Sequence, residues 1–413
     1  MNLIKNIFCL NIFLLIFFPL TAQPPLKQLP AYRCVHYDRN VLHFPNGHER
    51  QDTLYAKMDS LLVFGRGEIN VWHVGGSHVQ ADIFSHRMRL NLSNMIPDLA
   101  SGRGILFPYP IARTNYGYNY KVSYTGSWTT GKNTKKEQPY RLGITGMAAR
   151  TSDENASITL RLNTDGNELW KFNELRILGY GSNDSIFPYI VNGTDTLYAQ
   201  RDSIKPGFII HLKNAIDSTT LYMNVDDDEW FTLTGIEPDN RQGGIRYFSS
   251  GVNGAAVPAW LRCTDLQRDL QLVKPDLVIF AIGINDAAVP YGRFDAEHFK
   301  WGYRQLIDQV LRVSPDCAFI FITNNDSYRY VSRRRMAPNA NGRIVQEAFY
   351  DLAKEYKGAV WDLFDIMGGY GSVDSWELEG LVRRDRLHFT VDGYNLLGDL
   401  LYNALLTDYL FER

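Results

Sequence analysis

The sequence predicts an α/β fold built on a parallel sheet and interrupted by an inserted antiparallel β-sandwich. The regions around 51–110 and 245–413 alternate short apolar strands with amphipathic helices, which is the pattern of a parallel sheet covered on both faces. The stretch 120–244 has no helical periodicity; apolar and polar residues alternate there, and turn residues recur about every ten positions. At 413 residues, the chain is also longer than one ordinary core requires.

The first α/β segment ends in a turn with unusual chemistry. Apolar residues at helical spacing predict a helix over 54–62, and the apolar run 69–74 predicts a buried strand. Gly75-Gly76 follows the strand directly, then Ser77, and 79–92 is expected to be helical. A serine between a strand and a helix lies at the carboxyl edge of the sheet, where its hydroxyl is exposed.

The last segment repeats the same alternation. Its expected strands and helices are a strand at 276–282, a helix at 299–310, a strand at 317–323, a helix at 344–352, a short strand at 360–363 and a closing helix at 397–405. Repeated strand, helix, strand order implies parallel neighbours.

The middle segment contains a clear hairpin signal. Asn192-Gly193 separates two apolar runs, 187–191 and 194–198, and this dipeptide suits a tight turn between antiparallel strands. The acidic run 226–228 could bind calcium, but a solvated turn between two strands is the simpler interpretation.

Four segments are expected along the chain. A basic start and an apolar run too short to span a bilayer comfortably predict a signal peptide at residues 1–22, so the protein is expected to be exported, either periplasmic or secreted. The α/β domain is expected at 23–119 and 245–413, with the β-sandwich insert at 120–244. No stable membrane insertion is expected once the signal is removed.

Composition restricts the partners. Lys plus Arg (43) nearly balances Asp plus Glu (45), so nucleic acid is not an expected ligand. Cys34, Cys263 and Cys317 show no C-x-x-C spacing and are expected to be buried free thiols. His73, His78 and His86 are spaced too irregularly for a metal site, and neither a metal nor a cofactor is expected.

Two polar motifs suggest nucleophilic catalysis. Asp385 and His388 lie three residues apart in a loop before the last helix, so the carboxylate can fix the imidazole tautomer. The alternative is a surface loop in which Thr390 only caps the helix. With Ser77, these residues would complete a catalytic triad of Ser77, Asp385 and His388.

Two further segments offer hydrogen-bond donors. Residues 249–255 include Gly254, and residues 281–286 include Asn285; both segments fall at sheet edges. Gly254 could supply a backbone N–H and Asn285 a side-chain N–H to an acyl oxyanion, together with Ser77.

The order serine, glycine, asparagine, then Asp-x-x-His resembles the SGNH (GDSL-like) hydrolase superfamily. That resemblance implies a three-layer, flavodoxin-like α/β/α fold, and roles for Ser77, Gly254, Asn285 and His388, with Asp385 as the orienting acid. It covers roughly 51–110 and 245–413. Members usually have aspartate before the serine, where Gly76 stands here, which puts the local geometry in doubt.

The overall layout is similar to bacterial peptidoglycan O-acetylesterases, in which histidine likewise follows the serine. It implies a serine esterase that removes O-acetyl groups from a glycan, with peptidoglycan first, through an acetyl-serine intermediate, and an insert resembling a carbohydrate-binding module. Three alternatives stay open: an acetylxylan or other polysaccharide acetylesterase, an O-acetyltransferase with the same triad, and a non-catalytic glycan-binding protein.

Overall fold

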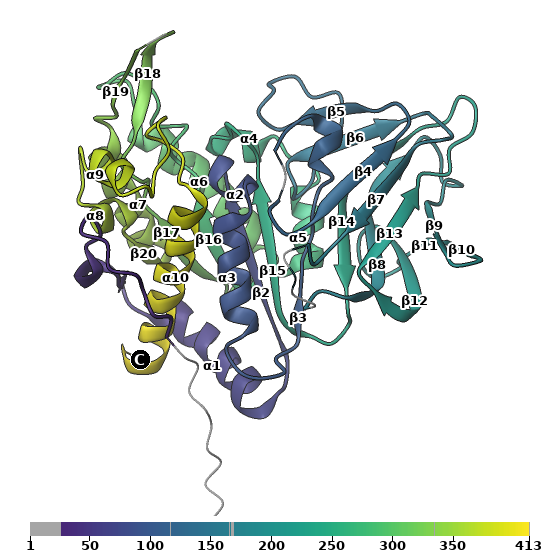
Figure 1. Ribbon diagram of the computed structural model, residues 1–413, viewed down its shortest axis with the longest axis horizontal. Helices are drawn as coiled ribbons and strands as arrows, with labels where there is room; N and C mark the ends of the chain where they lie inside the picture. The colour runs from purple at the N-terminus through teal and green to yellow at the C-terminus, as the bar shows by residue number, and fades with distance from the viewer. Residues whose placement is uncertain (1–25, 116, 165, 167–168, 334, 413) are drawn as a thin grey trace, which may run out of the picture.

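The structure is a computed structural model that describes residues 26–412, except 116, 165, 167–168 and 334. The signal peptide predicted at 1–22 lies outside these described residues. Within them, the chain forms two neighbouring regions, an α/β region and a β region (Figure 1).

The α/β region is built on a seven-stranded sheet in the order β1-β20-β17-β16-β2-β15-β3. All neighbours are parallel except the short edge pair β1 and β20. The strands, in chain order, are β1 (Leu42–His43), β2 (Glu68–Gly75), β3 (Ser101–Gly102), β15 (Gly244–Gly251), β16 (Leu277–Ala281), β17 (Ala318–Ile322) and β20 (Ala359–Trp361). The predicted fold class is confirmed, with helices on both faces of this sheet.

Strand residues alternate between the two helical layers. Val71 packs with the layer of α1 (Glu49–Phe64), α3 (Ile83–Ser93) and α10 (Val391–Thr407), whereas Trp72 packs with the opposite layer of α5 (Leu266–Val273), α6 (Ala296–Leu311) and α7 (Gly342–Tyr356). Figure 1 shows α3 and α10 crossing in front of the parallel strands. Shorter helices are α2 (Ser77–Gln80), α4 (Val257–Leu261), α8 (Leu363–Met367) and α9 (Val373–Leu378), with single turns at Tyr37–Arg39, Tyr109–Ala112 and Asp408–Glu412.

The β region contains two antiparallel sheets. One has the order β10-β9-β13-β7-β4 and the other β11-β12-β8-β14-β6-β5. The strands are β4 (Lys121–Thr125), β5 (Thr129–Lys132), β6 (Met147–Thr151), β7 (Ser157–Arg161), β8 (Phe172–Gly181), β9 (Tyr189–Asn192), β10 (Asp195–Tyr198), β11 (Gln200–Arg201), β12 (Phe208–Ile216), β13 (Ser218–Tyr222) and β14 (Phe231–Asp239). The expected hairpin is present: β9 pairs with β10 around Gly193, whose φ is +63°.

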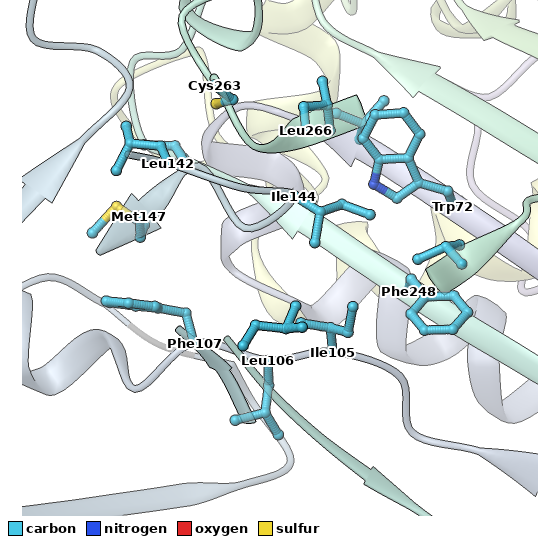
Figure 2. Packing of buried hydrophobic residues seen from close by; sticks show 14 of the residues in the cluster. Trp72, Ile105, Leu106, Phe107, Leu142, Ile144, Met147, Phe248, Cys263 and Leu266 are labelled. Atoms are coloured by element: carbon cyan, nitrogen blue, oxygen red, sulfur yellow. The ribbon is translucent and has the colours of Figure 1, made fainter. Parts of the chain in front are cut away.

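The two regions share one apolar core. Leu142, Ile144 and Met147 of the β region lie in the same buried cluster as Trp72 and Phe248 of the parallel sheet (Figure 2). Backbone hydrogen bonds also cross the boundary, from Asp265 N to Leu142 O at 2.8 Å and between Leu106 and Ile236 in both directions. Because burial of apolar surface is the main stabilising term in folding, the insert is fused to the α/β region rather than tethered to it.

The helix expected at 79–92 is interrupted, which corrects the sequence prediction. Helix α2 ends at Gln80, and Asp82 takes a left-handed conformation with φ of +52° before α3 begins. Asp tolerates this conformation better than most residues. Its buried carboxylate accepts hydrogen bonds from Arg89 at 3.1 Å and from Ser249 at 2.9 Å, and these bonds hold the break in place.

A second element absent from the sequence prediction is the hairpin of β18 (Tyr328–Ser332) and β19 (Arg335–Pro338), which projects from the α/β region (Figure 1). Cys34, Cys263 and Cys317 are buried and free, as expected. None of the helices in the described part of the chain is long and apolar enough to cross a bilayer.

Candidate active site

The predicted site residues follow three adjacent parallel strands. Ser77 comes after β2, Gly254 after β15 and Asn285 after β16, and β16-β2-β15 are neighbours in the sheet. Parallel strands present their carboxyl ends at the same edge, so the topology gathers segments that are far apart in the sequence.

Close packing of α2 on the sheet sets the position of Ser77. Gly251 at the end of β15 allows this approach, because a Cβ there would lie 2.1 Å from the backbone nitrogen of Gln80. Any larger residue at position 251 would push α2, and Ser77 with it, away from the sheet.

Ser77, His388 and Asp385 form one hydrogen-bonded chain. Ser77 Oγ lies 2.9 Å from His388 Nε2, and His388 Nδ1 lies 2.8 Å from Asp385 Oδ2. An ionised carboxylate only accepts hydrogen bonds, so the imidazole proton sits on Nδ1 and leaves Nε2 to accept the serine proton. This arrangement can remove the proton from the hydroxyl as the oxygen attacks an electrophile.

Asp385 is held as a carboxylate. Burial alone would raise its pKa, but hydrogen bonds from the His388 ring and from the backbone N–H groups of His388 and Leu387 outweigh burial and lower the pKa to about 2. The two backbone bonds are 2.9 and 3.0 Å long and both end on Oδ1, which leaves Oδ2 for the imidazole. Neighbouring loops hold this turn through bonds from Asn325 Nδ2 to Leu387 O and from Tyr328 N to Arg386 O.

Asn285 and Gly254 offer donors beside Ser77. Asn285 Nδ2 donates to Ala255 O at 2.9 Å, which uses one of its two N–H bonds and orients the amide. Gly254 has φ of +79°, and its N–H has no hydrogen-bond partner among the described residues. Both residues line the same cleft as Ser77 and His388.

Gln80 fixes the loop that carries Gly254, a role that sequence reasoning missed. Its side chain is only 2% exposed; Oε1 accepts from Asn253 N at 2.6 Å, and Nε2 donates to Asn115 O at 2.7 Å. One turn of α2 therefore carries both Ser77 and the group that positions its neighbouring donor. The only sequence signal was the three-residue spacing from Ser77.

The lack of a side chain at Gly76 leaves room for the side chain of Asn285. A Cβ at this position would lie 3.2 Å from Asn285 Nδ2 and 3.5 Å from Ala255 O. The first distance is tighter than ordinary van der Waals contact, so the amide of Asn285 packs against the bare Cα of Gly76. In this chain, the absence of a side chain before Ser77 and the position of Asn285 are mutually adjusted.

The cleft over these residues has a volume of about 640 Å³. Apart from Ser77, Gly254, Asn285 and His388, it is lined by Ala81, Ile83, Asn115, Tyr118, Asn253, Arg383, Leu387 and Tyr394. Such a volume accommodates a ligand the size of one or two sugar residues and leaves Ser77 open to solvent.

A buried ionic network lies beneath the cleft. Arg103, from the Gly102-Arg103-Gly104 turn, donates to the Asp82 carboxylate and to Asn119 Oδ1, and its side chain is 2% exposed. The two arginines near Asp82, Arg89 and Arg103, outweigh the effect of burial and lower the pKa of Asp82 to about 2. This network joins the start of α3 to the segment that leads into the β region.

His73, His78 and Asp286 have hydrogen-bond partners within the fold. His73 is fully buried, and its Nδ1 lies 2.8 Å from the Tyr247 hydroxyl. His78 contacts the Tyr394 hydroxyl at 2.8 Å, and its ring lies 5.5 Å from that of His388. Asp286 accepts from Val257 N at the start of α4, and burial raises its pKa to about 7. No group of three or more metal-binding side chains is assembled among the described residues.

Comparison with known proteins finds a family that is similar to part of this chain. Residues 235–396 match the GDSL-like Lipase/Acylhydrolase family, a span that includes Gly254, Asn285, Asp385 and His388 but begins after Ser77. Residues 235–396 are thus similar to a GDSL-like acylhydrolase domain. The prediction of a carboxylic ester hydrolase is confirmed at the level of this class.

One solved structure shares the fold of this chain well beyond residues 235–396. One described as a peptidoglycan O-acetylesterase in action is 20% identical, with a TM-score of 0.71, and the match covers 88% of this chain and 97% of that one. A variant of an acetyl xylan esterase from Geobacillus stearothermophilus is 19% identical with a TM-score of 0.28, covering 38% of this chain and 70% of the other. No curated protein sequence matches the chain.

Proposed function

We propose that this protein is a serine esterase that removes O-acetyl groups from a glycan, with peptidoglycan as the first candidate. The observation that carries the proposal is the continuous hydrogen-bonded chain from Ser77 Oγ through His388 to Asp385, at 2.9 and 2.8 Å, beside an open cleft. A solvent-accessible serine aligned in this way is the nucleophile that ester hydrolysis requires.

In the first step, Ser77 Oγ attacks the acetyl carbonyl while His388 Nε2 takes the hydroxyl proton. The carbonyl oxygen becomes an oxyanion, to which the Asn285 amide and the Gly254 N–H donate; donors of this kind are worth about 3 to 4 kcal/mol each. Asp385 stabilises the resulting imidazolium. His388 then returns the proton to the departing sugar oxygen, which leaves an acetyl-serine.

In the second step, water replaces the sugar. His388 takes a proton from the water as its oxygen attacks the acetyl-serine carbonyl, and the same donors bind the second oxyanion. Collapse of this intermediate breaks the bond to Ser77 Oγ, which regains its proton from His388, and acetate leaves. The same intermediate could instead pass its acetyl group to a sugar hydroxyl.

The proposed glycan substrate is supported by likeness rather than by a bound ligand. The structure that resembles this chain over 88% of its length, including the β region, is described as a peptidoglycan O-acetylesterase. The apolar run near the N-terminus adds the proposal that the protein acts outside the cytoplasm, in the periplasm or after secretion.

Acetate release from O-acetylated peptidoglycan and from acetylated xylan, assayed side by side, tests the proposal. Ser77→Ala is expected to lower kcat by about 10⁴-fold or more, because no other group supplies the nucleophile. Ser203→Ala is the matched control, since Ser203 is exposed in the β region and should leave the rate unchanged.

Serine-dependent release from peptidoglycan supports the cell-wall substrate, and release from xylan alone moves the substrate to other polysaccharides. Acetate release at a near-full rate by the Ser77→Ala variant would show that the triad assignment is wrong.

A further inference from the structure

A second cavity opens beside the catalytic cleft, at the junction of the two regions. It has a volume of about 240 Å³. Gln80, Ala112, Thr114, Val252 and Asn253 line it from the α/β region, and Thr130, Lys132, Lys135 and Met147 line it from the β region. It is thus the place where the insert comes within reach of a substrate in the site.

Asn253 joins this cavity to the catalytic cleft, because its side chain lines both. Its Nδ2 donates to Thr114 Oγ1 at 3.1 Å, and its backbone N–H donates to Gln80. The next residue is Gly254, the proposed oxyanion donor. A ligand group in the second cavity would therefore lie one residue along the chain from the reacting centre.

The combined surface is cationic. Its described lining residues include Arg383 in the cleft and Lys132 and Lys135 in the second cavity, and no carboxylate. All three cations are exposed, and no ion pair with a described acidic residue engages them. The net charge of the whole chain is −2, so this local excess of positive charge does not follow from the average composition.

Lys132 and Lys135 belong to a turn whose backbone is held by hydrogen bonds to the protein core. Asn133, between them, is fully buried; its carbonyl accepts from Arg262 Nε at 2.9 Å, and its N–H donates to Gly146 O at 2.9 Å. The backbone of Lys135 bonds to Lys132 O at 3.0 Å. The ammonium groups are flexible, but their attachment points are held against the core that the two regions share.

We propose that Lys132 and Lys135 form a carboxylate-binding subsite, so that the preferred substrate is an acetylated glycan with a carboxylate close to the acetyl-bearing sugar. The inference rests on the proposed function and narrows it. Charge-assisted hydrogen bonds from two ammonium groups to one carboxylate favour such a ligand over a neutral polysaccharide such as xylan. In this arrangement, the β region contributes substrate selection to a reaction performed by the α/β region.

The test is a charge-discrimination ratio. We define it as kcat/KM for O-acetylated peptidoglycan fragments divided by kcat/KM for the same fragments after their carboxylates are converted to amides. Each preparation is normalised by its rate on 4-nitrophenyl acetate, which reports how much active enzyme is present. Fragments with and without their peptides separate a carboxylate on the sugar from one on the peptide.

The wild-type ratio is expected to be about tenfold or more, mainly through KM, the size of one charge-assisted contact. Lys132→Gln with Lys135→Gln should bring the ratio close to one, and Lys132→Arg with Lys135→Arg should restore it. Lys136→Gln is the matched control, because Lys136 is equally exposed but lines neither cavity. A double glutamine variant that keeps the wild-type ratio would overturn the subsite.

Failure of the proposed function is detected separately. If the wild-type protein cleaves 4-nitrophenyl acetate through Ser77 but releases no acetate from any glycan, the proposal that its substrate is an acetylated glycan fails. The subsite is then measured by titrating the Ser77→Ala protein with carboxylate-bearing fragments. Binding that weakens about tenfold in the double glutamine variant supports the subsite, and binding that does not change refutes it.

Discussion

The α/β region and the β region bury their strands in different ways, and the difference explains where the chemistry lies. Helices cover both faces of the parallel sheet, so polar function is confined to the carboxyl edge, where Ser77, Gly254 and Asn285 follow adjacent strands. The β region has sheets with outward-facing surfaces instead, on which Tyr189 stacks on Tyr222 at 4.9 Å and Tyr198 is 56% exposed. The proposed catalytic residues lie in the first region, and the second region forms one wall beside them.

The two regions are nevertheless one folding unit, because the cluster around Ile144 and Trp72 is continuous across their boundary (Figure 2). An insert that shares its core with the catalytic region cannot rotate freely relative to it. Its side chains therefore take fixed positions relative to the active site, which a flexibly linked binding module would not provide.

The largest expected effect separates the regions by chemistry. Asp385→Asn should lower kcat by about 10²- to 10⁴-fold, because the amide no longer fixes the His388 tautomer or stabilises its cation. Asp153→Asn makes the same change in a β-region turn, where the carboxylate accepts from Ser127 N and Asn155 N. Steady-state rates should show no loss for Asp153→Asn. Equal losses in the two variants would mean that catalysis is not confined to the α/β region.

The next effect concerns the ionic network beneath the cleft. Arg103→Met leaves the buried Asp82 carboxylate short of a partner and should lower the free energy of unfolding by about 3 to 5 kcal/mol. Arg201→Met removes an ion pair whose side chains are 49% and 100% exposed, and should cost at most about 1 kcal/mol. Urea denaturation measures the free energy of unfolding of both variants. Similar losses would contradict the argument that the buried ion pair matters more to stability than the exposed one.

Removing an apolar side chain at the boundary tests the shared core. Ile144 is 1% exposed, and Ile144→Ala should cost about 2 to 4 kcal/mol. Unfolding followed by fluorescence and by circular dichroism should remain a single transition, shifted for both regions together. Ile204→Ala, at a position 89% exposed, is the control and should change stability by less than about 0.5 kcal/mol. Two separated transitions would show that the insert folds alone.

The smallest effect is a pH dependence that arises in the α/β region. Burial lowers the pKa of His73 to about 3, below its ordinary value of 6.5. Between pH 6.5 and pH 3, His73 is therefore protonated in the unfolded chain but neutral in the folded chain. The free energy of unfolding falls as the pH drops through this range. Between pH 7 and pH 5 this histidine should account for about 2 kcal/mol. His73→Asn should flatten the dependence of unfolding free energy on pH by that amount.

Ser203→Asn is the control in the β region, because Ser203 is exposed and does not titrate, so the pH dependence should stay unchanged. A His73 variant with the wild-type slope would place the acid sensitivity elsewhere.

Local sequence patterns predicted elements whose periodicity was strong. The runs at 276–282 and 317–323 became β16 and β17, and Asn192-Gly193 became the turn between β9 and β10. They failed where a tertiary contact decided the backbone: the helix expected at 79–92 is broken at Asp82, because buried arginines hold its carboxylate. The β18–β19 hairpin had no apolar periodicity to reveal it.

The candidate site was predictable in its residue types but not in its supports. Ser77, Asp385 and His388 stand in motifs whose spacing suggests their chemistry, and the fold brings them into hydrogen-bond contact. Gln80, Arg103 and Lys132 carry no such local signature. Their importance arises from what lies beside them in the folded chain, such as Asn253 beside Gln80.

By itself, the sequence determined the fold class and the class of reaction, and it predicted which groups react, because hydrophobic periodicity and short motifs are local properties. Only the tertiary structure decided that the insert shares a core with the catalytic region, that Gly76 accommodates Asn285, and that two lysines of the insert lie beside the cleft. These features depend on packing between segments that are not neighbours in the sequence, and no local pattern encodes which of them will meet.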